Sequence, residues 1–140
     1  MTKKLKFLRR VGVLAVLLGV YLAMVLVYTW SCVLRSDLRG GRHGPLDAYR
    51  HALASSVVSY TLNESAVDLI TVLFESKGKA SNRMDSHNNR IGACLGTRAA
   101  SFLDLEPTVR QSVLNGAVDA ADPDQITWLP ENKWRNGRIW

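Results

Sequence analysis

Two short segments of the sequence concentrate side chains that bind metal ions or carry protons. They are DAYRHA at residues 47–52 and MDSHNNR at residues 84–90. In the first, Asp47 and His51 are four residues apart, so on a helix they share one face about one turn from each other. A carboxylate in that position holds an imidazole in one tautomer and raises its basicity. Arg50, three residues from Asp47, is an alternative partner for the same carboxylate.

The second segment places Asp85 one helical turn before two amides. If both segments are helical and pack antiparallel or crossed, their polar side chains converge. Such a cluster binds a divalent metal through His and carboxylate ligands, or it combines a general base with amides that stabilise a developing oxyanion. Either arrangement suits hydrolysis of a phosphoester or an acyl ester, and the identity of any metal stays open. The predicted catalytic residues are His51, Asp47, His87 and Asp85, and the predicted substrate-binding residues are Arg50, Asn88 and Asn89.

The same polar residues also have a structural interpretation. Asp85 would favour the positive N-terminal end of its helix. Asn88 falls on an apolar seam, where a buried amide can fix the register of helix packing. Burying so many polar groups in a small domain is nevertheless costly. We therefore expect either a hydrolase or a non-catalytic module that binds a protein partner.

Other candidate groups are weaker. Ser55 lies four residues after His51 but lacks the strand–turn–helix setting of a nucleophilic serine. The acidic turn at residues 119–124 lacks the glycine and the closing glutamate of a helix–loop–helix calcium site, so we expect it to be solvated. His43 falls in a polar linker, and we expect it to be solvated as well.

A segment near the N-terminus determines where these helices reside. Residues 11–34 contain no charged side chain in 24 positions. About 20 apolar residues cross roughly 30 Å of hydrocarbon as a helix. A cleaved signal peptide would have a shorter apolar core, about 7–15 residues, and small residues at its cut site, whereas the bulky Trp30 stands here. We therefore predict a single transmembrane helix.

The charges on the two sides of this span set its predicted orientation. Residues 1–10 carry five basic side chains and no acid, whereas residues 35–44 carry three arginines and one aspartate. Basic flanks stay in the cytoplasm. We therefore expect a cytoplasmic N-terminus and the helical domain on the other side, with the lipid bilayer as a partner. In a bacterium this location is the periplasmic face of the inner membrane. There the hydrolase would act on an envelope component, a phospholipid or a cell-wall fragment, and the non-catalytic alternative would be an envelope module.

The net charge of +6 does not indicate a nucleic-acid partner. Five basic residues lie in the N-terminal flank, and the rest of the chain is nearly neutral, with 13 basic and 12 acidic residues. A nucleic-acid surface needs basic side chains clustered on the folded part. We therefore predict that the protein binds no nucleic acid.

Beyond the span, the apolar periodicity predicts an all-α fold, a small bundle-like domain. Small side chains on the first helix should let a neighbour approach closely, and Gly92 should do the same on the third. Two prolines and three tryptophans in the tail predict an extended segment whose indoles pack on the helices or, for Trp134 and Trp140, touch the membrane interface. The predicted parts are a flexible linker at 35–44, a helical domain at 45–119 with helices at 46–62, 63–77, 84–102 and from Pro107, a turn at 78–82, and a tail at 120–140.

The two cysteines leave two alternatives. Cys32 lies at the exit of the span and Cys94 in a predicted helix. A disulfide between them is permitted outside the cytoplasm. We favour the simpler alternative, in which Cys94 is a small buried apolar residue.

The two polar segments together resemble an uncharacterised family of bacterial helical domains. GPLDAYRHA at 44–52 and MDSHNNRIG at 84–92 are similar to its Asp-x-aromatic-Arg-His-Ala and Met-Asp-x-His-Asn-Asn-x-x-Gly motifs. The family looks like a domain near the C-termini of some large wall-associated or toxin-like proteins. The resemblance covers residues 44–100 and implies a bacterial envelope setting, in which the seven predicted site residues belong together, but it implies no mechanism. The chain departs from the family in its small size and short spacer, which argues against a secreted toxin.

Overall fold

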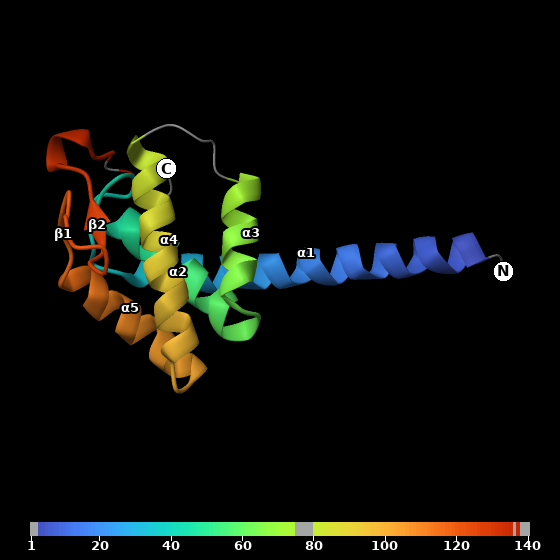
Figure 1. Cartoon of the computed structure of the whole chain (residues 1–140). Coiled ribbons are helices and arrows are strands. Elements are labelled where there is room, and N and C mark those ends of the chain that lie inside the picture. The colour runs from blue at the N-terminus through green and yellow to red at the C-terminus, as the bar shows by residue number, and fades with distance from the viewer. Residues whose placement is uncertain (1–2, 75–79, 136, 138–140) are drawn as a thin grey trace.

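The computed structural model describes residues 3–74, 80–135 and 137 and confirms the predicted all-α class. The long N-terminal helix projects from a small domain built by the other elements (Figure 1). Two strands of two residues form a short parallel pair, and two 3-10 turns flank the last part of the chain. The elements are α1 Lys3–Arg35, α2 Pro45–Thr61, α3 Glu64–Phe74, α4 Ala80–Arg98, a 3-10 turn Phe102–Asp104, α5 Leu105–Leu114, β1 Ala117–Val118, β2 Thr127–Trp128 and a 3-10 turn Glu131–Lys133.

Helix α1 is long and apolar enough to cross a membrane. Its N-terminal part stands free and exposes its apolar side chains, as expected of a segment that faces lipid. Its C-terminal part instead packs into the domain, where Val25, Thr29, Cys32 and Val33 are buried. The prediction assigned residues 11–34 wholly to the span, whereas in the structure the C-terminal part of this helix belongs to the core of the domain. Within the described residues, α1 is thus both the helix that could span a membrane and an element of the domain core.

The predicted flexible linker is instead a packed loop. Gly40 and Gly44 are buried beneath the indole of Trp134, and a Cβ atom on Gly44 would lie 2.6 Å from the Gly40 Cα. Gly40 has a φ of 74°, a conformation that glycine adopts without steric cost. The Trp134 indole Nε1 donates to the Leu129 carbonyl at 2.6 Å, so this tryptophan is held by the loop and the tail rather than by the membrane interface. Trp140 lies outside the described residues.

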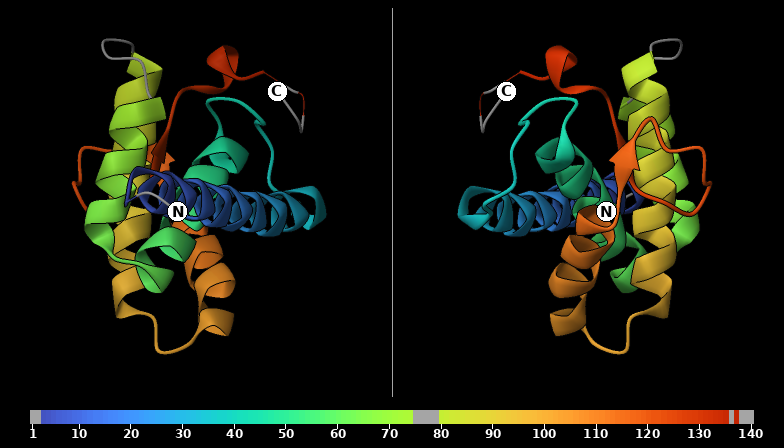
Figure 2. Two further views of the ribbon diagram at one scale, coloured as in Figure 1. Left: turned by 90° about the vertical axis from the view of Figure 1, so that its right-hand side faces the viewer. Right: turned by 90° about the vertical axis from the view of Figure 1, so that its left-hand side faces the viewer.

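Helices α2 and α4 form the centre of the domain through small side chains. A Cβ atom on Gly92 would lie 2.2 Å from the Ala52 carbonyl oxygen, and one on Gly96 would lie 2.3 Å from that of Ser56. The backbones therefore meet where the sequence predicted a close approach. The contact is extended by Ser59, whose Oγ donates to a carbonyl of α4 at 2.7 Å. Helix α3 lies beside α4 and completes this side of the domain (Figure 2).

Helix boundaries differ from the predictions at several points. Helix α4 begins at Ala80 and ends at Arg98, so residues 80–82 of the predicted turn are helical, residues 99–101 are not, and Phe102 begins a 3-10 turn. Helix α5 begins two residues before Pro107. The predicted end of the second helix, with Gly78, falls on residues 75–79, outside the described part of the chain.

The C-terminal segment is more ordered than the sequence suggested. Strands β1 and β2 pair over residues 117–118 and 127–128, at the end of the domain remote from the N-terminus of α1. Trp128 packs against the core cluster that contains Val109 and Ile126. This contact confirms the predicted packing of a tail tryptophan on the helices. Both cysteines are free thiols; Cys32 is buried, and Cys94 is half-buried rather than fully buried as we expected.

Candidate active site

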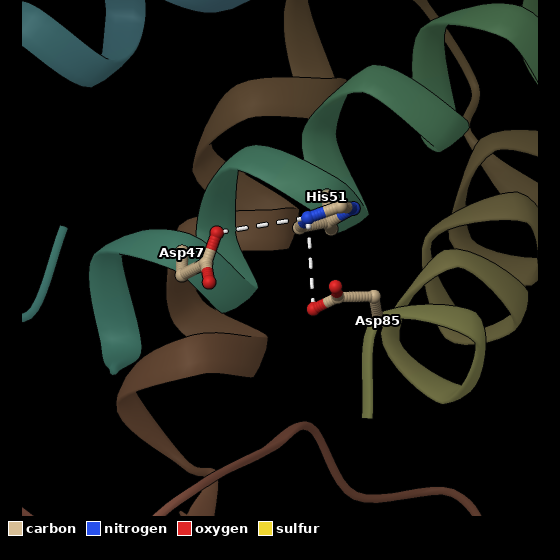
Figure 3. Close-up of side chains that lie close together, drawn as sticks. All are labelled: Asp47, His51 and Asp85. Carbon is tan, nitrogen blue, oxygen red and sulfur yellow. Dashed lines mark ion pairs between the residues drawn. The ribbon is translucent and has the colours of Figure 1, made fainter. Parts of the chain in front are cut away.

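Three of the predicted catalytic residues meet between α2 and α4 (Figure 3). The Nε2 atom of His51 lies 3.6 Å from the Oδ1 atom of Asp47 and 3.6 Å from the Oδ1 atom of Asp85. Side-chain exposure is 2% for Asp47, 16% for Asp85 and 25% for His51. The imidazole is therefore flanked by two carboxylates and is the most accessible of the three groups.

Asp47 is held rigidly by donors on its own side of the domain. The backbone N–H of His43 donates to its Oδ2 atom at 2.6 Å, and the Arg50 guanidinium donates to its Oδ1 atom. The same guanidinium lies over the Trp30 ring of α1, 5.4 Å from the ring centroid, a cation–π geometry. These donors offset the cost of burying the carboxylate. Arg50 was predicted to bind substrate, but the structure uses it to fix Asp47 and to join the site to the anchor helix.

His43 is part of this support and is not solvated as the sequence suggested. Its side chain is 20% exposed, and its φ of 66° aims its backbone N–H at Asp47. Burial lowers the pKa of His43 below the usual histidine value, Arg42 and other arginines lower it further, and the nearby Asp47 opposes the shift. The lowered pKa favours the neutral form of His43 near pH 7.

The structure does not bring His87 and Asn88 into the cluster. The Nε2 atom of His87 lies 2.8 Å from the Gln125 carbonyl oxygen. The Asn88 amide nitrogen donates to the Thr127 carbonyl at 2.8 Å, and its oxygen accepts the Thr127 N–H at 3.0 Å. Residues two apart on a helix point to opposite sides, so His87 cannot share the face of Asp85. Both residues fasten the C-terminal segment to α4, so the predicted convergence of His87 and Asn88 with His51 is wrong.

Asn89 lies beside the cluster, as predicted, and brings in two hydroxyl groups. Its Oδ1 atom accepts a hydrogen bond from Ser55 at 3.0 Å, and its amide nitrogen donates to Thr71 at 3.4 Å. Together with His51, these three side chains line one cavity. Sequence reasoning gave Ser55 no role. The available signal was its position one turn after His51 on the same helix.

The cavity lies between α1, α2, α3 and α4 and has a volume of about 360 Å³. Apart from the polar group around His51, its walls are aliphatic. The contribution of α1 was not foreseen, because an apolar span gives no sign of which side chains face protein. The aliphatic lining residues include Leu22, Val25 and Leu26 of α1, Ala54 and Val58 of α2, and Val67 of α3.

The geometry around His51 fits two kinds of chemistry. At 3.6 Å, neither carboxylate makes a direct hydrogen bond with Nε2. The three atoms converge instead, and all lie within 4.8 Å of one another. Ligands held about 2.0–2.1 Å from a tetrahedral cation are roughly 3.3 Å apart. The two printed separations, 3.6 Å each, are close to this value, so the three side chains could hold a divalent ion. A water molecule placed there would instead lie within reach of His51 as a general base.

The other acidic cluster predicted from the sequence has no comparable geometry. Asp119, Asp122 and Asp124 are exposed, as we expected for a solvated turn. Asp122 accepts the backbone N–H of Asp124 at 2.9 Å, a local turn contact. Within the described ranges, Asp47, His51 and Asp85 are the group of three whose donor atoms could hold a metal ion together.

Comparisons of the chain with protein-family models, with curated proteins and with solved structures found no match. The resemblance drawn from the two polar motifs therefore stays a prediction. The function has to be argued from the geometry of the cluster, the cavity and the anchor helix.

Proposed function

We propose that the protein is a membrane-anchored hydrolase in which His51 activates water for attack on an ester or phosphoester of the cell envelope. The observation that carries this proposal is the position of one imidazole. It stands 3.6 Å from each of two carboxylates and also lines an open cavity. A histidine kept only for packing would gain nothing from access to the cavity, whereas a catalytic histidine needs it.

The supporting residues fit a hydrolytic step. In the metal-free form, His51 takes a proton from water while the oxygen attacks the carbonyl carbon or the phosphorus atom. The protonated ring, stabilised between Asp47 and Asp85, then returns the proton to the leaving oxygen, so the step is balanced. A positioned general base of this kind contributes about 10²–10⁴ in rate. If a divalent cation binds here, Asp47, His51 and Asp85 would be the residues that hold it, and it would supply a bound water of lowered pKa.

The non-catalytic alternative accounts for part of the site only. His87 and Asn88 are structural, and Asp47 is satisfied by His43 and Arg50. A purely structural cluster would be sealed by hydrogen bonds. His51 has no such closure, since its ring is a quarter exposed and faces a cavity. This observation favours the hydrolase.

The first test is hydrolysis by the full-length protein in phospholipid vesicles, with wall fragments supplied in a parallel reaction. We expect the protein to release acidic products, measured by titration and mass spectrometry. If a cation is part of the site, a chelator abolishes the reaction and Zn²⁺ or Mn²⁺ restores it. If His51 acts alone as a base, the chelator has no effect.

The matched variants for this assay are Asp85→Asn and Asp124→Asn. The first removes a carboxylate beside His51, and the second removes an exposed one in the acidic turn. Only Asp85→Asn should lower the rate. Absence of turnover on both substrates, with and without metal, would contradict the proposal.

We further propose that the N-terminus is cytoplasmic and the domain periplasmic, on a bacterial inner membrane. The support is the basic flank of residues 1–10, which contrasts with the mixed charges after α1. A reporter enzyme that folds only in the periplasm, fused to the C-terminus, is expected to be active. A reporter active only in the cytoplasm should be silent at that position. The reverse pattern would overturn this orientation.

A further inference from the structure

We propose that the cavity beside His51 binds an acyl chain of a membrane phospholipid. This inference rests on the proposed function and names its substrate class, a phospholipid rather than a wall fragment. Four observations carry it: the depth of the cavity along α1, the chemistry of its walls, its polar end and its size.

The depth of the cavity follows from α1. At 1.5 Å per residue, Leu22 and Leu26 lie about 16 Å and 22 Å beyond Val11, within a hydrocarbon layer of roughly 30 Å. If the lysine and arginine side chains of residues 1–10 extend along their aliphatic stems to place their charges at the membrane interface, the span begins nearer Leu5. The same two leucines then lie about 26–32 Å along it, at the outer hydrocarbon edge. In either register the cavity opens at the level of lipid chains.

The walls of the cavity match an acyl chain and not a polar polymer. Its lining residues include no arginine, lysine, aspartate or glutamate, and most of its surface comes from aliphatic side chains of α1, α2 and α3. A sugar or peptide placed there would leave polar groups without partners, at a cost in free energy. Burial of a hydrocarbon chain is favourable. Helix α3, the domain element nearest the free part of α1 in Figure 1, also exposes 60% of Leu69.

The polar end of the cavity gives the bound lipid a direction. His51, Ser55 and Asn89 lie together there, and His51 belongs to the cluster with the two carboxylates. A chain inserted from the bilayer therefore points its ester and phosphate toward the proposed catalytic group. The volume, about 360 Å³, is at the lower end of the roughly 300–1,000 Å³ range of ligand pockets. We infer that the cavity takes one chain and leaves the other in the bilayer.

The experiment uses the full-length protein in vesicles that contain a phospholipid with a photoactivatable diazirine on one acyl chain. After illumination and digestion, mass spectrometry locates the adducts. Val58 and Val67 are 5% and 4% exposed, so bulk lipid does not reach them. We expect adducts on these two residues as well as on outward positions of α1 such as Val16. Adducts confined to outward positions of α1 would overturn the inference.

Two variants make the test specific to the cavity. Ala54→Phe fills it from α2, whereas Ala23→Phe adds the same ring at an exposed position of α1. We expect Ala54→Phe to reduce adducts on Val67 at least tenfold and Ala23→Phe to leave them unchanged. Equal adducts in both variants would contradict the inference. If Ala54→Phe does not fold, an excess of unlabelled phospholipid should suppress the Val67 adduct of the unmodified protein, and failure to do so would also overturn it.

His51→Ala separates lipid binding from hydrolysis. We expect this variant to keep the Val58 and Val67 adducts, with the mass of an intact phospholipid, while it releases no product. If the unmodified protein forms these adducts but hydrolyses nothing, the lipid-binding cavity is retained and the proposed hydrolase is overturned. Hydrolysis of a water-soluble ester without adducts at these valines would retain the hydrolase and overturn the cavity as its lipid site. If the adducts of His51→Ala instead have the mass of a fatty acid, the occupant of the cavity is a free fatty acid, and the inference of a bound phospholipid is overturned.

Discussion

Replacing His51 by alanine is expected to lower hydrolysis by at least about a hundredfold, because it removes the group that takes the proton from water. Folding should be little affected. The ring is 25% exposed and lies 3.6 Å from both carboxylates, beyond direct hydrogen-bond distance. Asp47 keeps its donors from His43 and Arg50 in the variant. The measurements are product release from vesicles and thermal unfolding of the full-length protein by circular dichroism.

His87→Ala is the matched control, since it removes the same side chain from the other polar segment. His87 contacts the Gln125 carbonyl and lies outside the cluster. Loss of that hydrogen bond should cost roughly 0.5–1.5 kcal/mol of stability, and the rate per folded molecule should be retained. The proposed role of His51 fails if both variants lose activity equally. It also fails if His51→Ala unfolds the domain as a structural residue would.

The different outcomes for the two histidines show how far the sequence specified the site. The four-residue spacing of Asp47 and His51 was sufficient to place both on one face of α2. Which residues of the second segment joined them depended on the rotation of α4 about its axis. A sequence signal for that rotation did exist, because Asp85, Asn89, Gly92 and Gly96 follow one another at steps of four, three and four. The glycines face α2, so their face carries Asp85 and Asn89.

Features that depend on long-range packing were not predictable in the same way. Val25 and Val33 of α1 are as hydrophobic as the residues that face lipid, so composition alone does not separate a membrane contact from a core contact. The loop at 35–44 has the arginine and glycine content of a flexible linker. Its glycines instead allow the chain to pack beneath Trp134, a residue about 90 positions later in the sequence. Strand β2 likewise contacts a helix distant in the sequence, because Thr127 and Asn88 share two hydrogen bonds.

Gly92→Ala is expected to destabilise the domain by at least about 3 kcal/mol, the upper part of the usual range for overpacking. The added methyl would lie 2.2 Å from the Ala52 carbonyl oxygen and 2.7 Å from the Ala52 Cα. Both are backbone atoms, so no rotamer change relieves the contact and α2 must move away from α4. Thermal unfolding of the full-length protein in detergent measures the effect.

Gly19→Ala is the control, because a Cβ atom at Gly19 meets nothing within 4 Å. Alanine is also favoured over glycine in a helix by roughly 0.5–1 kcal/mol, so this variant should melt at or above the temperature of the unmodified protein. Adding Ala52→Gly to Gly92→Ala should not restore stability, since the obstructing atoms belong to the backbone of residue 52. Equal melting temperatures for the two single variants would contradict this account of the helix contact.

The same substitution also links the helix contact to the site. Asp47 and His51 are carried by α2 and Asp85 by α4, so a wider gap between the helices lengthens the distance from His51 to Asp85 while that from His51 to Asp47 is kept. Any Gly92→Ala protein that still folds should therefore lose activity as Asp85→Asn does. Full activity in a folded Gly92→Ala protein would mean that hydrolysis does not require the two carboxylates to flank one imidazole.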